Sequence, residues 1–313
     1  MLCFSQDDGF NVTAFQHLFL PSVPWYQERY MKQVSLGSLM LLCVLRTLVF
    51  NLAKLNDLYL LDTFLAVISN MSPHMESIHP YASQRLVAVT LTVLKKYSSC
   101  AHRLAAAREA SGVRAGDSSV LTSESLHSSE SPVDLEQMLD VYKRSVEVLV
   151  RTICTCLRPR QIHKNTNIAY AIMHKQHSIL EALADPAFLA SQGVAEGGGA
   201  GSMPPLSGAL AGDLAFLRSL IQHIDQRIDQ AAEQDLSVER IMEIIERSTS
   251  TFPGIATSGG TAQTITRDDH LPVKIAHQEP DEPESFFVQY AWDVIKAFSQ
   301  GDLHWRQQPS AGV

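Results

Sequence analysis

Two cysteines and three histidines form the strongest grouping of possible metal ligands in the sequence. Cys154 and Cys156 are separated by one residue, and His163, His174 and His177 follow shortly after. Zinc accepts two thiolates and two imidazoles, and the last two histidines can share one helix face. However, Cys-x-Cys is not the usual chelating spacing, and both cysteines end an apolar stripe. We therefore interpret the thiols as core residues and predict no metal site.

Sequence patterns for nucleotide binding or hydrolysis are missing. The chain has no Gly-x-x-x-x-Gly-Lys-Ser/Thr loop, no Gly-x-Ser-x-Gly elbow and no His-Glu-x-x-His helix. The glycine-rich stretch 197–201 follows no predicted strand, so low complexity explains it. The other histidines have no nucleophile or second base at a readable spacing. We predict a protein that is not an enzyme, with no cofactor and no small-molecule substrate.

Aromatic and arginine side chains form two groups typical of protein interfaces. Trp, Tyr and Arg dominate the binding energy of many interfaces. The alternative is that Trp25 and Tyr26 only pack against the start of a helix, and the second group has a similar alternative. We predict that one of the two groups binds a protein partner. The first group is Trp25, Tyr26 and Arg29, and the second is Tyr81, Gln84 and Arg85.

The net charge limits the possible partners, and the cysteine content indicates the redox compartment. The formal net charge is −8, from 25 basic and 33 acidic residues, so general nucleic-acid binding is not expected. The one dense basic stretch, 158–164, is short and is interpreted as a loop. Five cysteines, mostly within apolar runs, indicate a reducing compartment and no disulfide framework.

Apolar residues recur with helical spacing along most of the chain, which predicts an all-α fold. Prolines 21 and 24 should end one helix and start another near Trp25. Further helices are expected at 36–53, 58–70, 81–108, 132–157, 165–183, 214–228, from 237 onward, and 284–299. The helices at 36 and 81 begin about 40 residues apart, which is typical of armadillo and HEAT repeats. We therefore expect a helical solenoid with disordered insertions.

The predicted organisation alternates helical repeats with insertions of low complexity. Serine and glycine dominate the first insertion, and glycine, alanine and proline the second. The expected segments are helical repeats 1–108, insertion 109–131, helical repeats 132–189, insertion 190–212, a helical hairpin 213–249, a loop 250–283 and a last helix 284–300.

The segment from Leu36 to Phe50 is nearly all apolar, so a membrane span over 36–52 is an alternative. Arg46 interrupts the run, and about 20 uninterrupted apolar residues are needed to cross a bilayer. We interpret the segment as a helix buried between other helices. An integral membrane protein remains the rival hypothesis.

Several segments in the same order resemble the C-terminal half of the dymeclin family. They include the stretches 7–11, 25–29, 35–39, 79–85, 165–170, 236–241 and 284–292. The resemblance implies a cytoplasmic protein, peripheral to Golgi membranes, that supports Golgi organisation and secretory traffic through trafficking partners. It supplies no catalytic residues. A generic helical-repeat interaction protein unrelated to the Golgi is the alternative.

Overall fold

The computed structural model describes residues 1–114, 132–158, 161–185, 208–231 and 237–252, together with positions 275, 288, 291, 292 and 295. The chain divides into two units, Met1–Ile275 and Ala276–Val313. In the second unit the described residues Val288, Ala291, Trp292 and Ile295 are helical and lie within the helix expected at 284–300. The rest of that expected helix lies outside the described residues.

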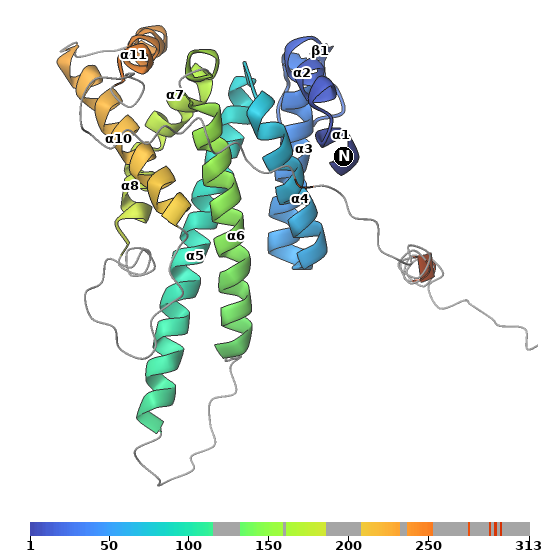
Figure 1. The fold of residues 1–313 in the computed structure, drawn as a ribbon, viewed down its shortest axis with the longest axis vertical. Helices are drawn as coiled ribbons and strands as arrows, with labels where there is room; N and C mark the ends of the chain where they lie inside the picture. The colour runs from blue at the N-terminus through green and yellow to red at the C-terminus, as the bar shows by residue number, and fades with distance from the viewer. Residues whose placement is uncertain are drawn as a thin grey trace, which may run out of the picture. The chain divides into compact units, whose positions relative to one another are not determined.

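The first layer of the larger unit contains two long helices and their N-terminal cover (Figure 1). Its elements are α1 (Leu2–Ser5), α2 (Asp8–Gln16), α3 (Leu36–Phe50), the π-helical turn η1 (Asn51–Leu55) and α4 (Leu58–Met71). Ser35 caps α3 through the Ser38 amide, and Asp57 caps α4 through the Leu60 amide. The helices predicted at 36–53 and 58–70 are therefore confirmed.

The central layer is an antiparallel pair, α5 (Pro80–Arg114) and α6 (Pro132–Cys156). A third layer follows, with the short helices η2 (Ser72–His74) and η3 (Ile162–Lys164) in the connections. Its helices are α7 (Thr166–His174), α8 (Gln176–Leu183), α10 (Gly208–Gln230) and α11 (Val238–Thr251). Helix α5 extends six residues into the expected Ser-rich insertion, and α10 begins within the second one.

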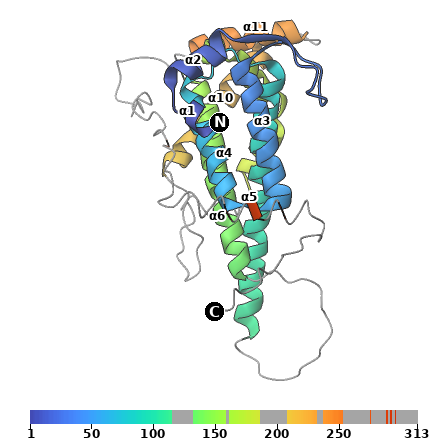
Figure 2. The ribbon, with the colours of Figure 1, turned by 90° about the vertical axis from the view of Figure 1, so that its right-hand side faces the viewer.

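The three layers share one hydrophobic core. Helix α5 contacts α3 in the first layer and α7 and α8 in the third, while α6 contacts α4 and α10. Figure 2 looks onto the first layer and shows α3 and α4 side by side in front of the central pair. The all-α class is confirmed. Helix α3 contacts both α4 and α5, and it runs antiparallel to α4. The armadillo/HEAT-like arrangement stays a prediction.

The helix predicted to start near Trp25 is wrong, because the chain forms a β-hairpin there. Strands β1 (Phe19–Ser22) and β2 (Lys32–Ser35) pair antiparallel, with Leu20 opposite Val34. Proline cannot donate to a ladder, but each strand of a two-stranded sheet has a free edge, so Pro21 is tolerated within β1. Proline spacing alone could not distinguish a helix break from an edge strand.

The single helix predicted at 165–183 is instead two short helices. Lys175 separates α7 from α8 with φ −113° and ψ 9°, which is outside helical geometry. The two halves pack differently. Among the described residues, α7 has extensive contacts with α11, whereas the main contacts of α8 are with α5 and α10. Tertiary packing has therefore overridden a continuous helical pattern.

Two connections that are far apart in sequence pair through side chains, and we call this pairing the loop seam. One side is the segment 73–78 and the other is 161–167. The bonds are Gln161 Nε2 to the Pro73 carbonyl, Lys164 to Glu76 at 2.7 Å, Asn165 Nδ2 to the Met75 carbonyl at 2.7 Å, and Asn167 Nδ2 to the Ile78 carbonyl at 3.1 Å. The loop seam joins the start of the third layer to the connection between the first two.

Candidate functional site

The loop of the β-hairpin is held by three apolar anchors and displays aromatic rings to solvent. Val23, Tyr26 and Met31 are buried, whereas the side chains of Trp25 and Tyr30 are 63% and 68% exposed. Tyrosine and tryptophan are enriched at protein interfaces, so exposed rings on an anchored loop are candidates for partner contact. We call the hairpin loop and its neighbours on α3 and α5 the hairpin cluster.

Glu28 is the polar centre of the hairpin cluster. Its Oε2 accepts a hydrogen bond from the Tyr26 hydroxyl at 3.1 Å and from the Tyr81 hydroxyl at 3.2 Å. Its Oε1 lies 3.4 Å from Nε of Arg46 on α3. One carboxylate therefore joins the hairpin loop to α3 and to the first turn of α5.

Stacked aromatic rings complete the same cluster. The Tyr26 and Tyr81 rings are 6.3 Å apart and nearly perpendicular, and the Trp25 ring lies 6.2 Å from Tyr26. The guanidinium of Arg29 lies over the Tyr81 ring, 5.4 Å from its centroid, in a cation–π arrangement. Arg29 is thereby fixed on the surface of the cluster that also contains the exposed Trp25.

The phenol of Tyr26 is a hydrogen-bond donor in this cluster and not a base. Burial raises the pKa of Tyr26 well above its usual value, and the neighbouring Tyr81 and Glu28 add to the rise. The hydroxyl therefore keeps its proton and donates a hydrogen bond to Glu28. The arrangement fixes side chains in place, and it presents Trp25, Arg29 and Tyr30 for contact.

His79 links the cluster to the start of α5. Its Nδ1 accepts a hydrogen bond from the Tyr81 amide at 3.2 Å, and Pro80 occupies the first position of the helix. Burial lowers the pKa of His79, and the Arg29 guanidinium lowers it further. The neutral imidazole thus acts as the N-terminal cap of α5.

We expect His79 to make the protein less stable as the pH falls below about 6.5, its usual pKa. The folded pKa is lower than the unfolded pKa, so between the two values the unfolded chain binds more protons and is favoured. His79→Asn keeps a capping acceptor but cannot titrate. Urea unfolding at pH 7.5 and pH 5.5 should show a smaller loss in this variant than in the unchanged chain. Equal losses would contradict the assignment.

The structure brings together four of the six residues that the sequence predicted for partner binding. Trp25, Tyr26, Arg29 and Tyr81 meet in the hairpin cluster, although Tyr26 is buried and only supports the others. Gln84 and Arg85 lie on the next turn of α5; Gln84 is exposed and Arg85 is half-buried. Partner binding by all six stays a prediction.

Sequence reasoning missed Glu28, Arg46 and His79 as members of the cluster. Glu28 lies between two residues of the predicted group, so its charge was available as a signal. Arg46 was visible only as the interruption of an apolar run, and its contact with Glu28 crosses from α3 to the hairpin. His79 precedes a proline at a helix start, a pattern that indicates a capping position.

The cysteines and histidines considered as zinc ligands have separate surroundings. Cys154 Sγ lies 3.5 Å from the Asp213 carbonyl oxygen, and Cys156 Sγ lies 3.8 Å from the Met75 sulfur. Burial raises the pKa of Cys156 to about 12, which favours the neutral thiol. Among the residues that the structure describes, no three His, Cys, Asp or Glu side chains gather as metal ligands would.

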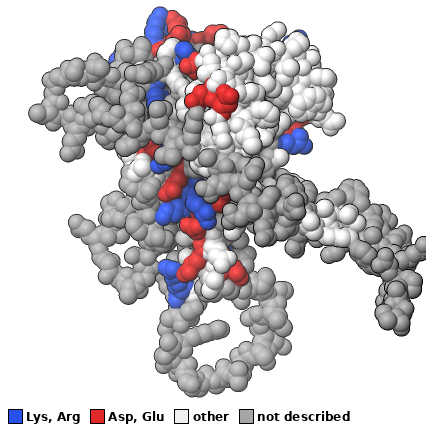
Figure 3. Space-filling model, turned by 45° about the vertical axis from the view of Figure 1, so that its right-hand side comes forward, with Lys and Arg blue, Asp and Glu red and all other residues white. Residues whose placement is uncertain are grey.

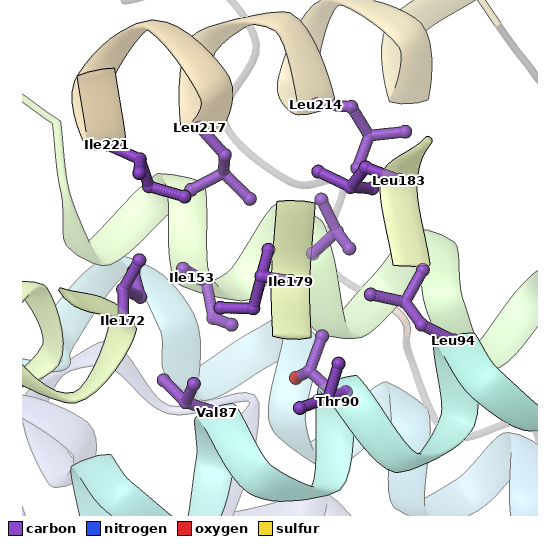
Figure 4. Close-up of a pocket in the computed structure, with 12 residues that line it drawn as sticks. Val87, Thr90, Leu94, Ile153, Ile172, Ile179, Leu183, Leu214, Leu217 and Ile221 are labelled. Atoms are coloured by element: carbon purple, nitrogen blue, oxygen red, sulfur yellow. The ribbon is translucent and has the colours of Figure 1, made fainter. Parts of the chain in front are cut away.

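A small cavity lies between the central and third layers (Figure 4). Its free volume is about 20 Å³, room for roughly one water molecule, whereas ligand pockets measure about 300–1,000 Å³. Aliphatic side chains from α5, α6, α7, α8 and α10 line it, and the one polar neighbour, Thr90, donates its hydroxyl to the Leu86 carbonyl. The cavity is therefore a packing gap of the core.

The described surface carries mixed charge. Figure 3 shows acidic and basic side chains interspersed on the visible face, next to a broad uncharged area. Within the described ranges, one helical stretch, Leu36–Leu55, is long and apolar enough to cross a membrane, and 61% of its most apolar window is buried. These buried positions pack against α2, α4 and α5.

Comparison with known proteins identifies one family. The family model "Dymeclin: Dyggve-Melchior-Clausen syndrome protein" matches residues 1–294. The curated dymeclin of Xenopus laevis is 29% identical over 98% of the chain, and that of Gallus gallus is 28% identical over 94% of it. The curated dymeclin of Drosophila melanogaster is 26% identical over the whole chain. The chain spans 39%, 37% and 38% of the length of these relatives. No solved structure matches the chain significantly.

Proposed function

This chain belongs to the dymeclin family, and from that membership we propose that it is a non-enzymatic adaptor of the secretory pathway. In this proposal it lies in the cytoplasm, peripheral to Golgi membranes, and supports Golgi organisation and vesicle traffic by binding trafficking proteins. Its stacked antiparallel helices belong to an armadillo/HEAT-like solenoid, a form that offers an extended surface for partner segments.

The exposure of Trp25 and Arg29 within one cluster is the observation that carries the binding role. Burial of Tyr26 and the Arg29–Tyr81 contact fix both side chains before any partner arrives. A fixed anchor binds more tightly than a mobile one, because less side-chain freedom is lost on association. The cavity between the central and third layers is too small for a substrate.

The test is co-purification from cells of the tagged chain and of variants in the hairpin cluster. Trp25→Ala and Arg29→Glu should each lower the recovery of Golgi trafficking proteins by about tenfold or more, as expected for interface anchors worth about 2 kcal/mol. Both residues are exposed, so helicity by circular dichroism should not change. Arg85→Glu is a poorer test, because the Arg85 Nε atom is buried.

Lys95→Glu provides the matched control. Lys95 is exposed on α5, and its reversal changes the net charge by the same amount as Arg29→Glu. Recovery of partners should survive this change. If Arg29→Glu and Lys95→Glu had equal effects, overall charge and not the hairpin cluster would govern binding.

The apolar stretch of α3 and η1 favours a second candidate, a protein that spans a membrane through Leu36–Leu55. Carbonate extraction of the tagged chain separates the two proposals. A peripheral adaptor is released into the soluble fraction, whereas a spanning protein stays with the membrane pellet.

A further inference from the structure

A buried amide on α4 binds the main chain of a residue that lies far away in the sequence. Asn70 is 2% exposed, and its Nδ2 donates to the Ile275 carbonyl oxygen at 3.0 Å. The Ile275 amide donates to the Asn70 Oδ1 at 2.9 Å. The two residues are 205 positions apart, and Ile275 is the last residue of the larger unit.

This pair of bonds recognises a polypeptide backbone and not a particular side chain. A carboxamide places one donor and one acceptor side by side, as a peptide group of a neighbouring strand does. Both partner groups belong to the main chain of Ile275, whose side chain is 43% exposed. A site of this kind accepts an extended segment with little dependence on its sequence.

The amide is held ready for this role by polar groups of α1 and α2. The Ser5 hydroxyl accepts from the Asn70 Nδ2 at 3.3 Å, which orients the amide. Ser5 is itself bound by the Asn11 Nδ2, through the Ser5 carbonyl at 2.8 Å. The Oδ1 of Asn11 is buried and, among the described residues, accepts no hydrogen bond. The network therefore retains one further acceptor that a main-chain amide could satisfy.

We propose that Asn70, oriented by Ser5, is a docking site for a polypeptide main chain, and that its occupant is the main chain of Ile275 in this same chain. Asn70 also begins an Asn-x-Ser sequence, and its burial and bonding give its amide a different task from carrying a glycan.

Hydrogen exchange of the full chain, selectively labelled with nitrogen-15 at isoleucine, tests the proposal. The Ile275 signal is assigned as the one that disappears in Ile275→Ala. In the unchanged chain its amide should exchange about tenfold or more slowly than in an unstructured peptide. Asn70→Ala should bring that rate to the unstructured value and leave the Ile221 and Ile224 amides of α10 protected.

Two further variants separate docking from a general loss of structure. Asn167→Ala removes a different hydrogen bond from a side-chain amide to a main-chain carbonyl, that of Ile78, and should leave the Ile275 amide protected. Asn70→Asp has nearly the same shape and keeps the acceptor for the Ile275 amide, but it loses the donor. It should give partial protection, and it serves if Asn70→Ala fails to fold by circular dichroism. Unprotected exchange of Ile275 in the unchanged chain, or protection that survives both Asn70 variants, would overturn the proposal.

Discussion

Replacing Asn165 with alanine is expected to lower the free energy of unfolding by about 2–4 kcal/mol, because it leaves two buried carbonyl groups without a donor. Asn165 is fully buried, and its Nδ2 donates to the Met75 carbonyl at 2.7 Å and to the Cys156 carbonyl at 3.0 Å. The second acceptor is the last residue of α6, where the helix itself offers no partner. Urea unfolding followed at 222 nm measures the change.

Asn167→Ala is the control for that prediction. Asn167 is half-buried and donates a single bond to the Ile78 carbonyl across the same loop seam, so its removal should cost about 1 kcal/mol or less. Asn165→Asp should destabilise at least as much as Asn165→Ala at neutral pH. It replaces the donating Nδ2 with a carboxylate oxygen, which would face the Met75 and Cys156 carbonyl oxygens and repel them. Similar losses for Asn165→Ala and Asn167→Ala would show that burial of the carbonyls does not decide the effect.

Gly37→Ala is expected to destabilise the protein by about 1–3 kcal/mol, as overpacked core substitutions do. A Cβ atom at this position would lie 2.6 Å from Cγ and from Cδ1 of the Phe15 ring. That ring is fully buried between α2 and α3, so it cannot move without disturbing the contact of the two helices. Thermal and urea unfolding should both report the loss.

The same substitution at another glycine should have the opposite sign. A Cβ atom at Gly212, inside α10, meets no atom within 4 Å. There the better helix propensity of alanine is unopposed and should stabilise the helix by up to about 1 kcal/mol.

A double-mutant cycle tests the clash at Gly37 itself. Combining Gly37→Ala with Phe15→Leu should recover part of the stability lost in Gly37→Ala, since the smaller side chain makes room. Additive effects in that cycle would contradict a clash between these two residues.

The long helices could be predicted from the sequence because their signals are local. The apolar residues of 36–50 and 58–70 repeat at helical spacing, and Ser35 and Asp57 stand where caps are needed. The Ser131-Pro132-Val133-Asp134 start of α6 is an equally local signal. Each of these patterns is complete within a few turns of chain.

What the sequence could not show depends on contacts between distant residues. The hairpin replaces the expected helix near Trp25 because Val23, Tyr26 and Met31 find partners on other elements. Trp25, Tyr26 and Arg29 were identified together because they are neighbours in the chain. Their contacts with the distant Tyr81, made by the Tyr26 ring and the Arg29 guanidinium and supported by Glu28, could not be read from local spacing. No local pattern indicates that Asn165 forms a hydrogen bond with the main chain of Met75, or Asn70 with that of Ile275.

The loop seam constrains the order in which parts of the chain can fold. Its two sides are separated by 88 to 90 positions, and the whole central pair of helices lies between them. On a growing chain, the carbonyl oxygens of Pro73 and Met75 must therefore stay with water until α6 has been made and has turned back along α5. These contacts come late, so we expect substitutions in the loop seam to hasten unfolding more than they slow refolding.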